Sequence, residues 1–109
     1  MKELPTALQY DAPVTYIVLN NFGLGWIKFG QKRRGNRFIA TDFNTQPDFA
    51  VIAKANGCYG ERIEKPENIR SALQNALKAN EEGKPAVLDF VVDGWDFAPG
   101  FLSFYNKLR

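Results

Sequence analysis

The hydrophobic positions of the chain form three strand-like runs that alternate with helix-like stretches. Residues 14–20 and 86–92 are apolar almost throughout and rich in β-branched side chains, which is typical of parallel strands buried on both faces. A shorter run at residues 58–64 is interpreted as a third strand. Strands that alternate with helices predict an α/β fold with a mainly parallel sheet.

Two helices are predicted from short apolar stripes and from the residues that end them. Residues 3–10 are interpreted as the remainder of a helix that is broken before Pro13. A second helix is expected to begin at Pro47, which suits a first helical position, and to stop at Gly57. Its expected inward face consists of Phe49, Ile52 and Ala53.

The strongest helical pattern covers residues 66–83. Apolar side chains recur there at positions i, i+3, i+4, i+7 and i+8, which predicts a single stripe facing the core. The stripe consists of Ile69, Ala72, Leu73, Ala76 and Leu77. By contrast, residues 31–46 show no clear period after the short helix expected to start near residues 22–30, so they are interpreted as a long loop.

These elements predict one domain over residues 1–109, a partial three-layer αβα sandwich with a mainly parallel sheet. Three strands make a thin sheet for this class, and the first strand lacks a neighbour. Because an exposed apolar sheet edge invites another chain, we expect a homodimer or higher oligomer, or a missing N-terminal portion. The aromatic tail at residues 94–109 is expected to pack on the domain or an interface, with an active-site lid as the alternative.

Composition narrows the chemistry that the chain can perform. A single cysteine, Cys58, excludes an internal disulfide and is expected to be a small buried side chain, and the lack of histidine removes the commonest transition-metal ligand. Any metal is therefore expected to be a hard, oxygen-liking ion. No apolar run is long enough for a membrane span, and the start lacks a signal-peptide pattern, so we expect a cytoplasmic protein without a membrane partner.

A basic stretch, "QKRRGNR", contains Lys32, Arg33, Arg34 and Arg37. The preferred interpretation is a solvated loop, and the alternative is a small anion- or RNA-binding module. The net charge of +2 is too small to indicate a nucleic-acid partner, so none is expected. Another charge, Asp89, lies in an apolar strand, where we expect a structural hydrogen bond.

The stretch "VTYIVLNNFGLGW" ends a buried strand on two asparagines followed closely by two glycines. Asn20 and Asn21 can satisfy backbone groups in an ordinary turn. They can also supply oxygens to magnesium, which takes few protein ligands together with phosphate oxygens and water. Gly23 would let the backbone approach an anion closely. From the residues alone, both interpretations remain open.

The stretches "ELPTALQYDAPVTYIVLNNFGLGWIK", "PDFAVIAKANGCYGERIEKPENIRSALQNAL" and "KPAVLDFVVD" resemble the C-terminal domain of thiamine-diphosphate-dependent enzymes. The similarity is to the acetolactate synthase-like group, which includes sulfoacetaldehyde acetyltransferase and related decarboxylases. It extends from about Glu3 to Asp93 in order. The pair Asn20-Asn21 matches the end of the diphosphate motif of the family.

The resemblance implies thiamine diphosphate and Mg²⁺ as cofactors and a small 2-oxo acid as substrate. It implies that the side chain of Asn21 and the backbone carbonyl of Gly23 are ligands of magnesium, with Asn20 in the same cofactor-binding motif. Leu24 and Trp26, just beyond, would line the thiazolium pocket. The activity implied is decarboxylation or carboligation, that is, lyase or transferase chemistry.

The chain departs from the family pattern in one important respect. The Gly-Asp-Gly half of the motif, which supplies the main anionic ligand of magnesium, is absent, and the activating glutamate of the family comes from another domain. The chain is therefore expected to contribute the Asn-Asn half of a site and to be inactive by itself, with no catalytic residue of its own. The alternative is a non-catalytic, oligomerising remnant that binds no cofactor.

Overall fold

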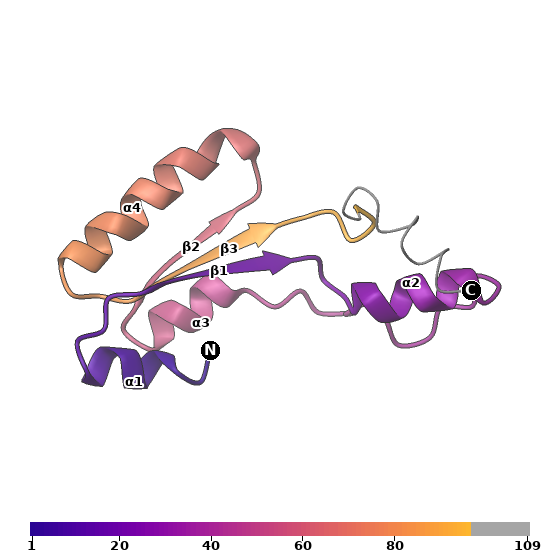
Figure 1. Cartoon of the computed structure of the whole chain (residues 1–109), viewed down its shortest axis with the longest axis horizontal. Helices are drawn as coiled ribbons and strands as arrows, with labels where there is room; N and C mark the ends of the chain where they lie inside the picture. Colours follow the sequence, from indigo (N-terminus) through magenta and orange to yellow (C-terminus); the bar gives the residue numbers. More distant parts are fainter. Residues whose placement is uncertain (97–109) are drawn as a thin grey trace, which may run out of the picture.

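The computed structural model describes residues 1–96 and contains a three-stranded parallel sheet (Figure 1). The strands are β1 (Thr15–Asn20), β2 (Tyr59–Ile63) and β3 (Ala86–Val91), and their spatial order is β1-β3-β2. In register, Ala86 of β3 lies between Thr15 and Tyr59. The α/β class, the parallel sheet and its three strands are confirmed, and the last strand in sequence is the middle strand in space.

Helices cover the sheet on both sides, which gives the three layers expected (Figure 1). Helix α1 (Leu4–Gln9) and helix α3 (Phe49–Ala55) pack on one face, and a 3₁₀ turn, η1 (Pro66–Asn68), leads into α4 (Ile69–Glu81) on the other. Helix α2 (Gly25–Arg33) lies away from the sheet, beyond the carboxyl end of β1. No helix within residues 1–96 is long and apolar enough to cross a membrane.

The face under α1 and α3 has a closed core. Its buried members are Leu4, Ala53, Cys58 and Val87, and Leu8, Tyr16, Val18 and Phe49 pack against them. Burial of Cys58 is confirmed, and it raises the pKa of the thiol. A Cβ at Gly60 of β2 would lie 2.2 Å from the carbonyl oxygen of Ala50, so α3 sits directly on this strand.

The face under α4 is only partly closed. Its core consists of Ile63, Ala72, Ala76, Ala86 and Leu88. The predicted stripe of α4 is therefore confirmed for its alanines and wrong for its larger members, because Ile69, Leu73 and Leu77 remain exposed. The alanines pack over β2 and β3. The leucines lie beyond the three strands of the sheet, so no strand among the described residues covers them.

Strand β1 contradicts the prediction that it is buried on both faces. Its side chains alternate between the two sides, so Tyr16 and Val18 pack under α1 and α3 while Ile17 and Leu19 point to the α4 side. Ile17 is 55% exposed and Leu19 is 69% exposed. The reason is that α4 reaches only the start of β1, where the Thr15 hydroxyl donates to Asn80 at 2.7 Å.

Two boundaries and one buried position also differ from the sequence prediction. Helix α3 begins after Asp48, whose carboxylate accepts a hydrogen bond from the Val51 N–H at 2.9 Å, so Pro47 lies outside the helix. Ile52 is exposed, and Ala50 takes its expected place in the core. Helix α2 continues through Arg33, so the long loop starts only after it.

Candidate functional site

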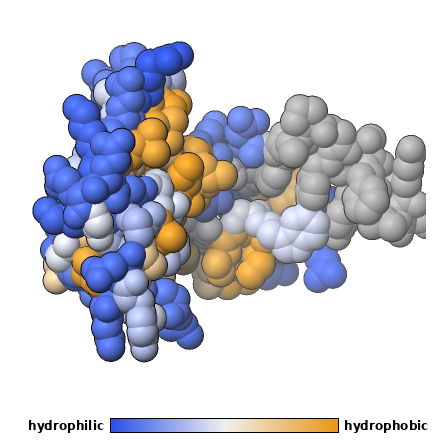
Figure 2. Space-filling view, turned by 60° about the vertical axis from the view of Figure 1, so that its left-hand side comes forward, coloured by the Kyte–Doolittle hydropathy of each residue, from blue (hydrophilic) through white to orange (hydrophobic). Residues whose placement is uncertain are grey.

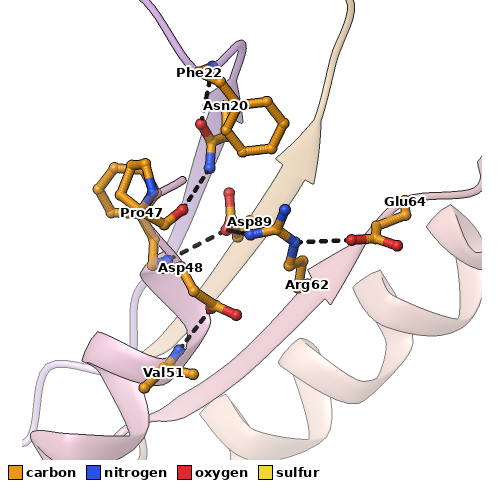
Figure 3. A network of polar contacts seen from close by, with 9 residues as sticks. Asn20, Phe22, Pro47, Asp48, Val51, Arg62, Glu64 and Asp89 are labelled. Atoms are coloured by element: carbon orange, nitrogen blue, oxygen red, sulfur yellow. Dashed lines mark hydrogen bonds and ion pairs between the residues drawn. The ribbon is translucent and has the colours of Figure 1, made fainter. Parts of the chain in front are cut away.

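The turn after β1 lies at the carboxyl end of the sheet, where parallel α/β sheets bind ligands. Asn20, the last residue of the strand, is 4% exposed and uses both ends of its amide within the chain. Its Nδ2 donates to the Pro47 carbonyl at 3.0 Å, and its Oδ1 accepts from the Phe22 N–H at 3.2 Å (Figure 3). Asn20 therefore joins the turn to the segment that leads into α3.

Asn21 and Gly23 form the next part of the turn. The Asn21 Oδ1 accepts a hydrogen bond from the Gly23 N–H at 3.3 Å, and its second lone pair can accept another, because Asn21 is only partly buried. Cβ atoms built at Gly25 and Gly94 would lie 2.7 Å from Asn21 Nδ2 and 3.2 Å from Asn21 O. The absence of side chains at these two glycines thus makes space for the Asn21 side chain and backbone.

The glycine at position 23 is required by a close backbone approach. A Cβ there would lie 2.6 Å from the Thr41 carbonyl oxygen, which accepts a hydrogen bond from the Leu24 N–H at 2.8 Å. Phe43 N–H also donates to the Phe22 carbonyl at 2.9 Å. The long loop therefore folds back and fixes the turn from the side opposite the sheet.

Phe22 occupies the left-handed backbone region, with φ of 54°, which is costly for a bulky residue and needs surrounding support. Its ring lies under the Arg62 guanidinium, 5.2 Å from the ring centroid to Cζ. Arg62 also pairs with Glu64 at 3.0 Å and with Asp89 at 3.7 Å. A side chain of β2 thus steadies the turn that follows β1.

Asp89 is 0% exposed and connects this arginine to α3 (Figure 3). Its Oδ2 accepts from the Phe49 N–H at 3.2 Å, which confirms the structural hydrogen bond expected for this charge. Its Oδ1 has no hydrogen-bond partner among the described residues. The sequence drew attention to Asp89 by its apolar surroundings, but Arg62 was missed, since only the β2–β3 register places the two side by side.

Leu24 and Trp26 are placed at the start of α2, and both are exposed. They lie just beyond the turn, as the order of the sequence requires. Within the basic stretch, Lys32 belongs to the last turn of α2, and its Nζ lies 4.9 Å from the Trp95 ring centroid. Trp95 also meets Phe38 edge to face, and the remainder of the aromatic tail, residues 97–109, is outside the described part of the chain.

The donor set at the turn fits half of a magnesium site. Neutral oxygens of the type Mg²⁺ accepts come from the Asn21 side chain and the Gly23 backbone. Residues 1–96 contain no group of three or more His, Cys, Asp or Glu side chains that could hold a metal.

The family described as "Thiamine pyrophosphate enzyme, C-terminal TPP binding domain" matches residues 1–90. The chain is 32% identical over 104 residues to the "Putative thiamine pyrophosphate-containing protein YdaP" of Bacillus subtilis, covering 95% of this chain and 17% of the relative. It is 36% identical over 95 residues to the acetolactate synthase isozyme 3 large subunit of Escherichia coli, covering 86% of this chain and 17% of that subunit.

The acetolactate synthase large subunit of Haemophilus influenzae is 38% identical over 94 residues, covering 85% of this chain and 16% of the relative. The chain thus spans between 15% and 17% of the length of such relatives, in their C-terminal part. The match to the family covers most of the chain, and the three-stranded parallel α/β fold agrees with it. The chain belongs to the thiamine pyrophosphate enzyme family, as part of its C-terminal cofactor-binding domain.

Proposed function

We propose that the chain is a segment of a thiamine-diphosphate- and Mg²⁺-dependent decarboxylase or carboligase that acts on a small 2-oxo acid. Support comes from the acetolactate synthases among its relatives. The observation that carries the proposal is the turn after β1, where Asn21 and Gly23 stand at the carboxyl end of a parallel sheet with room left by Gly25 and Gly94. The chain alone is inactive in this proposal, because it supplies only part of the site.

The residues of the turn have different roles. Asn21, through Oδ1, and Gly23, through its carbonyl, would hold the magnesium ion. Asn20 is buried, and both of its amide atoms already have partners within the chain, so its role is to hold the Phe22 backbone against the segment before α3. Leu24 and Trp26 would provide apolar surface beside the cofactor ring.

When bound, thiamine diphosphate supplies the nucleophilic carbanion and the electron sink for reaction at the 2-oxo carbonyl. The contribution of this chain is positional. It fixes the metal-binding oxygens on a rigid turn that is tied to three elements, β1, β2 and α3. A site held in this way loses little freedom when the metal arrives.

The test uses a chimera in which this chain replaces the matching C-terminal region of the E. coli acetolactate synthase isozyme 3 large subunit. Calorimetry measures binding of Mg²⁺ in the presence of thiamine diphosphate. We expect Asn21→Ala to weaken binding at least about tenfold, because an oxygen ligand is lost. The surface variant Gln74→Ala, which also removes an amide, should bind as the parent does.

Two results would contradict the proposal. A folded chimera that gives no heat at millimolar ligand would identify the chain as a remnant that no longer binds cofactor. Equal affinity in the parent and in Asn21→Ala would show that the amide does not contact the metal. An Asn20→Ala chimera separates the two asparagines, since we expect it to lose thermal stability even without cofactor.

A further inference from the structure

Phe22 is the strained residue of the turn between β1 and α2. Its φ of 54° lies in the left-handed region, where a bulky side chain is rare and needs support from its surroundings. Its N–H donates to the Asn20 Oδ1 at 3.2 Å, and its carbonyl accepts from the Phe43 N–H at 2.9 Å. Much hydrophobic surface of the molecule stays exposed (Figure 2), and Phe22 is only partly buried. Burial alone therefore does not hold its ring in place.

The backbone of Phe22 sets the position of the two oxygens that the proposed function assigns to magnesium. Asn21 precedes Phe22 and Gly23 follows it, so a change in the φ angle of Phe22 moves one oxygen relative to the other. In the present conformation the Gly23 N–H reaches back to the Asn21 Oδ1 at 3.3 Å. Relaxation of Phe22 to a negative φ would swing Gly23 away from this oxygen. The arrangement of the proposed metal ligands thus depends on a strained residue that is not itself a ligand.

The ring of Phe22 lies against the guanidinium of Arg62, a residue of β2 that is two strands away in the sheet. The Cζ atom of Arg62 is 5.2 Å from the ring centroid, within the range of a cation–π contact. A planar guanidinium can lie flat on an aromatic ring, which the compact ammonium of a lysine cannot do. Arg62 has no lone pair to offer a metal, so it would act on a magnesium site through Phe22.

Arg62 is itself held in place by two carboxylates. The β2–β3 register sets it beside Asp89, and its Nη1 lies 3.7 Å from the Asp89 Oδ2. Its Nε donates to Glu64 at 3.0 Å, so the guanidinium stands between the two acidic side chains (Figure 3). Asp89 is fully buried and also accepts from the Phe49 N–H of α3. Because its own position is fixed by these partners, Arg62 is suited to hold a neighbouring residue in a strained conformation.

We infer that Arg62 is a positioning residue for the metal-binding turn. Through the ring of Phe22 it keeps the turn in the left-handed conformation in which the Asn21 Oδ1 and the Gly23 carbonyl serve one ion. The identity of that ion rests on the proposed function, whereas the hold of Arg62 on Phe22 concerns the chain itself. Arg62 is therefore expected to set the affinity for Mg²⁺ as well as the stability of the fold.

The competing interpretation is a structural arginine that only balances the buried charge of Asp89. Substitutions of Phe22 separate the two interpretations, because they leave the pair between Arg62 and Asp89 intact. Phe22→Leu removes the aromatic face and keeps an apolar side chain, whereas Phe22→Tyr retains the face. Arg62→Lys keeps a positive charge near Asp89 but loses the planar guanidinium. The matched control is Arg70→Lys, which makes the same change at an exposed position of α4.

The first test measures Mg²⁺ binding by calorimetry, in the presence of thiamine diphosphate, in the chimera with the E. coli subunit. We expect Phe22→Leu and Arg62→Lys each to weaken binding about tenfold, as is typical of residues that orient metal ligands. Phe22→Tyr and Arg70→Lys should bind as the parent does. A double variant with Phe22→Leu and Arg62→Lys should lose no more affinity than either single variant, because both changes remove the same contact. Unchanged affinity in Phe22→Leu, or losses that add in the double variant, would overturn the inference.

The second test needs no cofactor and uses the isolated chain. The NMR coupling between the Hα of residue 22 and the preceding carbonyl carbon distinguishes a positive from a negative φ. We expect a positive φ in the parent and in Phe22→Tyr, and a value averaged toward negative φ in Phe22→Leu and Arg62→Lys. A positive φ retained in both of these variants would overturn the inference. A parent chimera that binds no Mg²⁺ would instead refute the proposed function, and the coupling in the isolated chain would still decide whether Arg62 holds the turn.

Discussion

On the α1/α3 side of β1, Tyr16 and Val18 pack against a closed core, whereas on the α4 side of the same strand Ile17 and Leu19 are exposed. The two faces have similar apolar side chains, so hydrophobicity does not explain the difference. Within residues 1–96, the two faces differ in how many helices cover them: α1 and α3 together cover one face, and α4 covers only part of the other. One strand can thus be covered on one face and exposed on the other.

The largest expected effect compares one substitution on the two faces. Leu4→Ala removes a fully buried side chain from the closed core and should lower the free energy of unfolding by about 2–4 kcal/mol. Leu19→Ala alters an exposed side chain and should change it by less than about 0.5 kcal/mol. Urea denaturation of the isolated chain measures both. Similar losses would show that β1 is already covered on its α4 side in solution.

The second prediction concerns the buried carboxylate that links the sheet to the closed face. Arg62→Met removes the cation next to Asp89 and should destabilise the chain by about 3 kcal/mol, because the carboxylate is then buried without a counter-charge. Glu64→Gln, which neutralises the exposed partner of the same arginine, should cost less than about 1 kcal/mol. Thermal denaturation measures the stability of both variants. Equal losses of stability would contradict this interpretation.

The third prediction involves the smallest change in stability. It compares the reaction rates of thiols placed on the two faces. Cys58 on the closed face should react slowly with an aromatic disulfide at pH 8, because burial both blocks access and raises the pKa of the thiol. A Leu19→Cys variant, made in a Cys58→Ala background, should react at least about a hundredfold faster. Comparable rates would place both positions in the same environment.

The sequence predicted the elements well because their signals are local. The apolar runs and the alanine-containing stripe of α4 specify strands and a helix whatever surrounds them. It did not predict the exposure of Ile17 or Leu77, because burial depends on whether a neighbour exists, and an amphipathic pattern records only that one is needed.

The candidate site shows the same division. Asn21 and Gly23 were identified from one continuous stretch, and the structure places them together in one turn. The support that Arg62 gives the turn was missed, because Arg62 is distant from Phe22 and Asp89 in sequence and meets them only through the order of the strands. Asn20 was predicted as part of the cofactor motif, and its buried amide could be recognised only from its contact with Pro47.

The position of β3 in the middle of the sheet has a consequence for the time at which the chain can fold. During synthesis β1 and β2 leave the ribosome first, yet neither has a partner strand within this chain until Ala86–Val91 follows. Pairing of Thr15 with Ala86 then closes a loop that includes most of the described residues, a kind of contact that slows folding. Nascent chains would therefore leave the apolar side chains of β1 without their partner strand until β3 has been synthesised, a state that is prone to aggregation.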